Sequence, residues 1–112
     1  MKSFSYKGRS IFATSKKQAL DYIKEGKQEE CSLKKLFDYL YPTDVVFDYY
    51  STSKEGAYIK VILYNDLYVD IYHWSFCQYR IIEHDNNSEQ KEKELYWSHK
   101  ELIEYLNVNY EG

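Results

Sequence analysis

Alternation of apolar and polar side chains between residues 45 and 84 is the feature that most restricts the fold of this chain. In the stretch YVDIYHWSF, residues 68–76, every second position carries tyrosine, aspartate, tryptophan or phenylalanine, and the positions between them begin with Val69 and Ile71. A period of two places alternate side chains on opposite faces of a β-strand. The set that starts at Val69 and continues through His73 therefore predicts the side of the strand that faces the core.

Four such segments follow one another, at residues 45–50, 57–64, 67–76 and 77–84. Turn residues separate the first three, whereas no break separates Phe76 from Cys77, so the chain needs a bulge or sharp bend there. Short turns make neighbouring strands antiparallel, so these segments predict a meander. Within each strand the aliphatic positions share one parity, which predicts the face that helices cover. These positions are Val45, Phe47, Ile59, Val61, Leu63, Leu67, Val69 and Ile71.

Serine residues that precede runs of helical periodicity predict three helices around this sheet, because a serine oxygen can accept an unpaired amide of the first turn. The predicted helices span residues 16–25, 33–40 and 99–107. Gly26 is the expected end of the first helix. Residues 2–15 have apolar side chains around a glycine and predict a hairpin, whereas the charged segment 89–94 predicts a solvated loop.

Together these elements predict an α+β fold, with an antiparallel sheet of four to six strands whose meander core lies at about residues 45–84. Two N-terminal helices and one C-terminal helix accompany the sheet. A chain of 112 residues is expected to form a single domain, residues 1–112. The N-terminus is too polar for a secretory signal and no apolar run is long enough to span a bilayer, so a cytoplasmic protein without membrane contact is expected.

The sequence patterns that usually carry catalysis do not occur in this chain. It has no Gly-rich phosphate loop and no G-x-S-x-G motif. Cys31 and Cys77 are far apart and form neither a disulfide framework nor a zinc motif, and the three histidines lack the spacing of metal ligands. We therefore expect a protein that is not an enzyme, with no catalytic residue, no metal and no cofactor.

The predicted sheet has an unusual second face, opposite to the aliphatic one. Solvated sheet faces normally carry Thr, Lys, Glu and Ser, but this one carries many of the fourteen tyrosines of the chain. Tyrosine and tryptophan are favoured at interface hot spots because they offer large rigid area at a small entropic cost. The predicted partner-binding residues are Tyr50, Tyr58, Tyr64, Tyr68, Asp70, Tyr72 and Trp74.

Three explanations of this aromatic face remain open at the level of sequence. Cross-strand aromatic pairs could stabilise the sheet, or the last helix could cover the face as a second core. The face could bind a protein partner, including a second copy of the chain in a homodimer. It could also stack nucleic-acid bases, but stacking surfaces lie in a positive field and the acidic residues nearby oppose this. Nucleic acid is therefore not expected as a direct ligand of the protein.

Charge is divided unevenly along the chain. Residues 1–40 contain nine Lys/Arg and five Asp/Glu, whereas residues 41–112 contain six Lys/Arg and thirteen Asp/Glu. Such asymmetry can indicate a charged partner, although both sets of charges are equally consistent with ordinary solvated faces. An alternative function is therefore a small nucleic-acid-binding or regulatory domain that uses the basic N-terminal half. The basic residues of that alternative are Lys7, Arg9, Lys16, Lys17, Lys34 and Lys35.

In its size, its richness in tyrosine, lysine and glutamate, and its segment FATSKKQAL at residues 12–20, the chain resembles small accessory proteins of bacteriophages and mobile elements. The resemblance implies a protein that binds and blocks a host defence or replication enzyme, as anti-CRISPR inhibitors of Cas nucleases do. An acidic, aromatic surface of such a protein would compete for a basic nucleic-acid groove. The leading expectation is therefore a non-catalytic inhibitor with a protein partner in the cytoplasm of a bacterial host.

Overall fold

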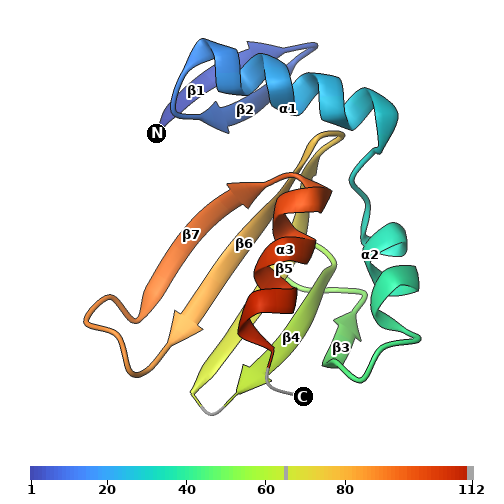
Figure 1. Cartoon of the computed structure of the whole chain (residues 1–112), viewed down its shortest axis with the longest axis vertical. Helices are drawn as coiled ribbons and strands as arrows, with labels where there is room; N and C mark the ends of the chain where they lie inside the picture. Colours follow the sequence, from blue (N-terminus) through green and yellow to red (C-terminus); the bar gives the residue numbers. More distant parts are fainter. Residues whose placement is uncertain (65, 111–112) are drawn as a thin grey trace.

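The computed structural model describes residues 1–64 and 66–110 of the chain, which form three helices and seven strands. In chain order they are β1 (Lys2–Tyr6), β2 (Arg9–Ala13), α1 (Lys16–Gln28), α2 (Leu33–Leu40), β3 (Val46–Tyr50), β4 (Tyr58–Tyr64), β5 (Leu67–Ser75), β6 (Gln78–Asp85), β7 (Glu92–Trp97) and α3 (His99–Asn109) (Figure 1). The first two strands form a separate hairpin, and the other five form an antiparallel meander in the order β3-β4-β5-β6-β7. The predicted α+β fold is therefore confirmed.

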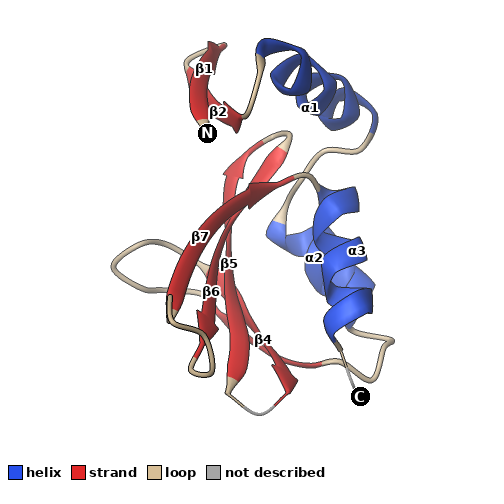
Figure 2. Ribbon diagram, turned by 60° about the vertical axis from the view of Figure 1, so that its left-hand side comes forward, coloured by secondary structure: helices blue, strands red, loops and turns tan. Residues whose placement is uncertain are grey.

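The main core lies between one face of the five-stranded sheet and the helices α2 and α3 (Figure 2). The inward-facing aliphatic side chains of β4, β5 and β6 are buried here against Leu36 and Leu40 of α2 and Leu102 and Leu106 of α3. The last helix thus covers the aliphatic face that the alternation predicted. It does not cover the aromatic face, so that explanation of the tyrosines is wrong.

Residues 1–28, which we call the N-terminal unit, pack the β1-β2 hairpin against α1 at one end of the sheet (Figures 1 and 2). This unit has its own cluster of buried side chains, to which the turn between β5 and β6 contributes Cys77. The side chain of Gln78 joins the two parts: its amide nitrogen donates to the Phe12 carbonyl at 2.8 Å, and its oxygen accepts from the Phe12 amide at 3.1 Å. The hairpin is therefore hydrogen-bonded to the end of the sheet.

The helices begin where the serines predict. Ser15, Ser32 and Ser98 each accept a hydrogen bond from a backbone amide of the first turn, and Glu101 completes a capping box at the start of α3. Helix α2 has the predicted bounds, whereas α1 and α3 each continue for a few residues beyond the prediction.

Gly26 does not end the first helix; the helix continues to Gln28, with Gly26 buried on its inner side. A Cβ atom at this position would lie 2.5 Å from the Cβ of Cys77 and 2.8 Å from its Cα. The absence of a side chain therefore allows α1 to approach the β5-β6 turn closely. The glycine is required by packing and not by the end of a helix.

Two further predictions fail locally. The segment 89–94 is not entirely a loop, because β7 begins at Glu92 and pairs with β6 through Glu92, Lys93 and Glu94. His73 does not face the core, and its side chain is exposed. It lies beside a register shift between His73 and Ser75, so the alternation of β5 is interrupted there.

Within the described residues, no helix combines the length and the apolar character that a membrane crossing requires.

Candidate functional site

The side of the five-stranded sheet that faces away from α2 and α3 is the candidate site, and we call it the outer face (Figure 2). The strand register brings its side chains into three rows across the sheet. The first row is Tyr50, Tyr58, Tyr72, Arg80 and Tyr96. The second row is Asp48, Lys60, Asp70, Ile82 and Glu94, and the third is Val46, Ile62, Tyr68, His84 and Glu92.

In the first row, three tyrosine rings stack on one another, and the Arg80 guanidinium lies next to the third ring. The Tyr50 and Tyr58 rings are stacked with centroids 4.8 Å apart, and the Tyr58 and Tyr72 centroids are 5.1 Å apart. The guanidinium carbon of Arg80 lies 5.5 Å from the Tyr72 centroid, within the range of a cation–π contact. Burial and the neighbouring carboxylates of Asp70 and Glu55 raise the pKa of Tyr72 to about 12. Its phenol therefore stays neutral and can donate a hydrogen bond to a partner.

The third row contains a second stack, built around Tyr68. Its ring lies against the His84 imidazole with centroids 4.5 Å apart, and the Lys60 ammonium is 4.4 Å from the Tyr68 centroid. The Nε2 atom of His84 lies 3.0 Å from Oδ2 of Asp70, and its Nδ1 atom lies 3.4 Å from Oε1 of Glu92. The imidazole is thus fixed between two carboxylates.

Asp70 lies at the centre of the outer face, beside a hollow of about 520 Å³. Its Oδ1 atom is buried and has no hydrogen-bond partner among the described residues. Burial raises the pKa of Asp70, against the opposing effect of His84 and Lys60. The lining residues of the hollow include Tyr72, Arg80, Ile82, His84 and Glu92. A buried acceptor without a partner costs free energy, so a donor group that entered the hollow would be stabilised there.

The structure brings together five of the seven predicted site residues on this face: Tyr50, Tyr58, Tyr68, Asp70 and Tyr72. Trp74 instead contacts the N-terminal unit. Its indole N–H donates to the Ser10 carbonyl at 2.7 Å, and its ring packs against Phe12.

Tyr64, the seventh predicted residue, lies beyond a register shift that starts after Ile62, and it pairs with Leu67. It borders a hollow that Ile62 and Tyr68 also line, at the margin of the outer face.

Three residues of β6 on the outer face were not predicted as site residues: Arg80, Ile82 and His84. Their signal is the same alternation that identified β4 and β5. A two-residue turn at Phe76-Cys77 carries the parity from β5 into β6, and this turn contains none of the residues that usually mark a turn. The bend was therefore expected only because the segments 67–76 and 77–84 adjoin, and no turn residue marks it.

The outer face is acidic. Its three rows hold the carboxylates Asp48, Asp70, Glu92 and Glu94 but only two cations that are always charged, Lys60 and Arg80. Arg80 is already paired, with Nε 3.1 Å from Glu94 and a second nitrogen 3.6 Å from Glu55 of the β3-β4 loop. The unneutralised charge of the face is therefore negative.

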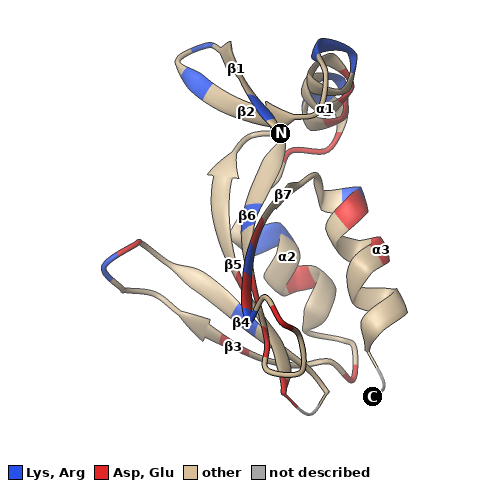
Figure 3. Cartoon of the chain, turned by 90° about the vertical axis from the view of Figure 1, so that its left-hand side faces the viewer, with Lys and Arg blue, Asp and Glu red and all other residues tan. Residues whose placement is uncertain are grey.

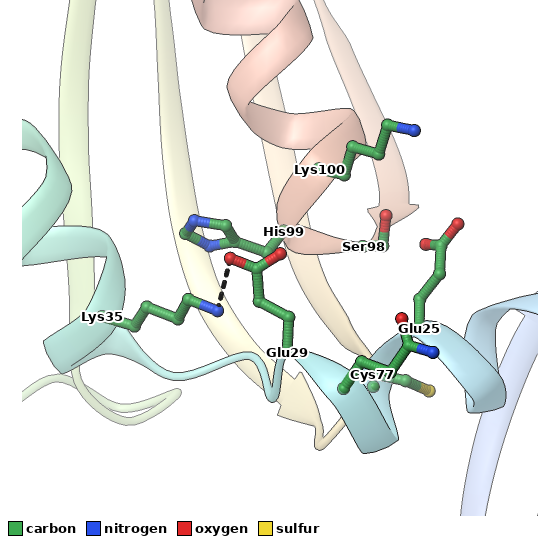
Figure 4. A pocket seen from close by; sticks show the side chains of 9 residues that line it. Glu25, Glu29, Lys35, Cys77, Ser98, His99 and Lys100 are labelled. Atoms are coloured by element: carbon green, nitrogen blue, oxygen red, sulfur yellow. Dashed lines mark ion pairs between the residues drawn. The ribbon is translucent and has the colours of Figure 1, made fainter.

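A second cavity of about 510 Å³ lies where α1, α2 and the start of α3 meet (Figure 4). Its lining includes Cys77 and His99, and Lys35 pairs with Glu29 at 2.8 Å in its wall. Burial raises the pKa of the Cys77 thiol and lowers the pKa of His99. Figure 4 shows the thiol pointing away from the imidazole, whose Nδ1 lies 2.9 Å from the Tyr79 hydroxyl. A cysteine nucleophile requires a lowered pKa and an adjacent base, and this arrangement supplies neither.

Among residues 1–64 and 66–110, no group of three His, Cys, Asp or Glu side chains is placed to hold a metal ion. No protein family matches the chain, and no curated protein or solved structure matches it significantly. The fold and the site therefore define a class in physical terms only. The chain is an α+β protein with one sheet face covered by helices and an opposite face that carries tyrosines and acidic residues.

Proposed function

We propose that the protein is a non-catalytic inhibitor whose outer face occupies the basic nucleic-acid-binding groove of a protein that handles nucleic acid. The observation that carries this proposal is the open sheet face itself, where stacked tyrosines lie among carboxylates. A positively charged partner surface is favoured because acidic groups outnumber basic ones on the face, and complementary charge steers association. The tyrosines then supply the contact area.

The aromatic side chains of the outer face are already held in fixed positions, so binding a partner costs little conformational entropy. Tyr50, Tyr58 and Tyr72 hold one another in place through ring contacts, and Tyr68 is held between a lysine and a histidine. Side chains that are already fixed lose little rotamer freedom when a partner arrives, and this loss is about 0.5–1.5 kcal/mol for each mobile side chain. The surface is therefore preorganised.

The resemblance to accessory proteins of phages and mobile elements narrows the proposed partner to a bacterial defence or replication enzyme, such as a CRISPR-Cas nuclease. The inhibitor would act in the cytoplasm of the bacterial host, where these enzymes bind DNA or RNA. Their grooves are basic because they track a phosphate backbone. An acidic face that fills such a groove prevents the nucleic acid from entering.

The test uses a panel of purified bacterial Cas nucleases and replication enzymes, each loaded with a fluorescent oligonucleotide that the inhibitor should displace. The double variant Tyr58→Ala/Tyr72→Ala removes the centre of the stack. We expect roughly a 30-fold loss of inhibition, since each hot-spot truncation costs about 1 kcal/mol or more. The control is Tyr41→Ala, which removes an exposed tyrosine side chain at the end of α2, away from the outer face.

Two results would contradict the proposal. One is a wild-type protein that displaces nucleic acid from no member of the panel. The other is a folded double variant that inhibits as well as the wild type. Sedimentation of the free protein distinguishes a third case, because a dimer that the double variant abolishes would mean that a second copy closes the outer face.

A further inference from the structure

The N-terminal unit carries seven cations that form no ion pair with any described residue. They are Lys2, Lys7, Arg9, Lys16, Lys17, Lys24 and Lys27, and all seven are exposed. The same unit contains only two acidic residues, Asp21 and Glu25. Every ion pair among the described residues lies instead between positions 29 and 94. The positive charge of the unit is therefore available to a partner.

Two of these cations converge on one aromatic ring. The Lys7 ammonium lies 5.5 Å from the Tyr6 centroid, and the Lys27 ammonium lies 5.8 Å from the same centroid. Arg9 is the cross-strand neighbour of Tyr6 in the hairpin. The tip of the hairpin and the last turn of α1 thus bring two ammonium groups to Tyr6, and Arg9 lies opposite Tyr6 in the hairpin.

The hairpin turn fixes Lys7 in this position. Lys7 and Gly8 both have positive φ, at 47° and 78°, and they are the only residues between β1 and β2. Positive φ at both central residues is typical of a type I′ turn, in which asparagine and glycine are preferred to lysine. A lysine at the tip is therefore not explained by the local geometry, and its exposed amine is the property that distinguishes it from asparagine.

We propose that the N-terminal unit binds the phosphate backbone of nucleic acid, with Lys7, Arg9 and Lys27 as its main contacts. Like charges that converge without an acidic partner repel one another, and a bound phosphate relieves that repulsion. In Figure 3, Lys and Arg mark the hairpin and α1, which also carries Asp and Glu, whereas both kinds of charge occur on the sheet and at the start of α3. The site borders the outer face, because Arg9 lines a hollow together with Tyr72 and Arg80, but the proposal does not depend on the function proposed for that face.

The chemistry of the unit favours nucleic acid over an anionic membrane. Helices that lie on membranes present a continuous apolar face, but the apolar face of α1 is buried against the hairpin. Leu20 is the only large apolar side chain of α1 that is exposed. The Tyr6 ring packs against Phe76 with centroids 5.7 Å apart and is not free to stack on a base. The contact is therefore with backbone phosphates and carries no sequence preference.

The test is the salt dependence of binding to a fluorescent 20-base-pair duplex, measured by anisotropy. Three phosphate contacts predict a log–log slope of about −2.7, so the affinity of the wild type falls about 40-fold between 50 and 200 mM salt. The variant Lys7→Asn/Lys27→Gln keeps one contact, and its affinity falls only about 3.5-fold over that range. Lys7→Asn creates an Asn-Gly turn, which suits the type I′ geometry, so loss of binding cannot be attributed to an unfolded hairpin.

The matched control is Lys54→Gln/Lys91→Gln, which removes two exposed lysines outside the unit and changes the net charge equally. It should keep the wild-type slope, and Lys7→Arg/Lys27→Arg should keep both slope and affinity. Absence of duplex binding at 50 mM salt, an equal effect of the control variant, or tighter binding to anionic phospholipid vesicles than to the duplex would overturn the proposal. The outer-face variant Tyr58→Ala/Tyr72→Ala should bind the duplex normally, so the two proposals can fail separately.

Discussion

Replacement of Gly26 by alanine tests the way in which α1 is attached to the sheet. The added methyl group would lie 2.5 Å from the Cβ of Cys77, and 2.8 Å from both the Cα of Cys77 and Cδ2 of Phe76. Carbon atoms in contact are normally about 3.5–4.0 Å apart, so the methyl group cannot be accommodated without movement. The nearest atoms include backbone of a two-residue turn, which cannot yield as a flexible side chain does.

Two opposing effects set the size of the change. Alanine is favoured over glycine inside a helix by about 0.8–1.0 kcal/mol. Overpacking of a close contact costs about 1–3 kcal/mol, and three contacts below 3 Å place this site at the upper end. We therefore expect Gly26→Ala to lower the free energy of unfolding by about 1–2 kcal/mol.

The measurement is urea denaturation of both proteins, followed by far-UV circular dichroism and by tryptophan fluorescence. A peptide that spans residues 14–29 provides the control, because there the same substitution meets no neighbour and should raise helicity. An intact protein that becomes more stable with alanine would show that helix propensity decides at this position. The proposed close approach of α1 to the β5-β6 turn would then be wrong.

Two other predictions concern Trp74, which contacts the N-terminal unit, and His99 at the start of α3. Trp74→Phe keeps an aromatic side chain, with one ring in place of the indole, but leaves the Ser10 carbonyl without its indole donor. We expect the free energy of unfolding in urea to fall by about 1–3 kcal/mol, and a decrease below about 0.3 kcal/mol would contradict this. Burial lowers the pKa of His99 in the folded state, so the unfolded chain binds more protons below about pH 6.5. Stability should be complete above that pH and fall as the pH decreases toward the lowered value, by at most about 1.4 kcal/mol per pH unit, and His99→Gln should remove this dependence.

Most of the fold could be predicted because its signals are local. Alternation identified the strands of the meander, and serine caps identified the start of each helix. The bounds of α2 were predicted correctly because a cap precedes it and a proline follows it closely. The position of Gly26 inside the helix and the charged first half of β7 could not be predicted in this way. The glycine depends on Cys77, which is distant in sequence, and the charged residues of β7 are accommodated by Arg80 and His84 on the neighbouring strand.

The candidate site was predictable only as far as the alternation was regular. Tyr58, Tyr68 and Tyr72 lie on one face because β4 and β5 pair without interruption between them. Register shifts near the ends of the strands displace two of the predicted site residues. Tyr64 lies beyond one shift, and Trp74 lies within another and contacts the hairpin. A register shift depends on tertiary packing, so the sequence pattern of a single strand does not reveal it.

The positive charge of the N-terminal unit and the negative charge of the outer face have no evident role in stability. Surface ion pairs contribute about 0–1 kcal/mol each, and the cations of the N-terminal unit are not used for such pairs. On the outer face it is the cations that are already engaged: Arg80 pairs with a carboxylate and Lys60 lies over a ring. Asp70, by contrast, has an oxygen without a partner among the described residues. The N-terminal unit therefore presents unneutralised positive charge, and the outer face presents unneutralised negative charge. The two proposals are compatible with one complex of protein and nucleic acid, in which the outer face would contact the basic protein and Lys7 and Lys27 would contact phosphate.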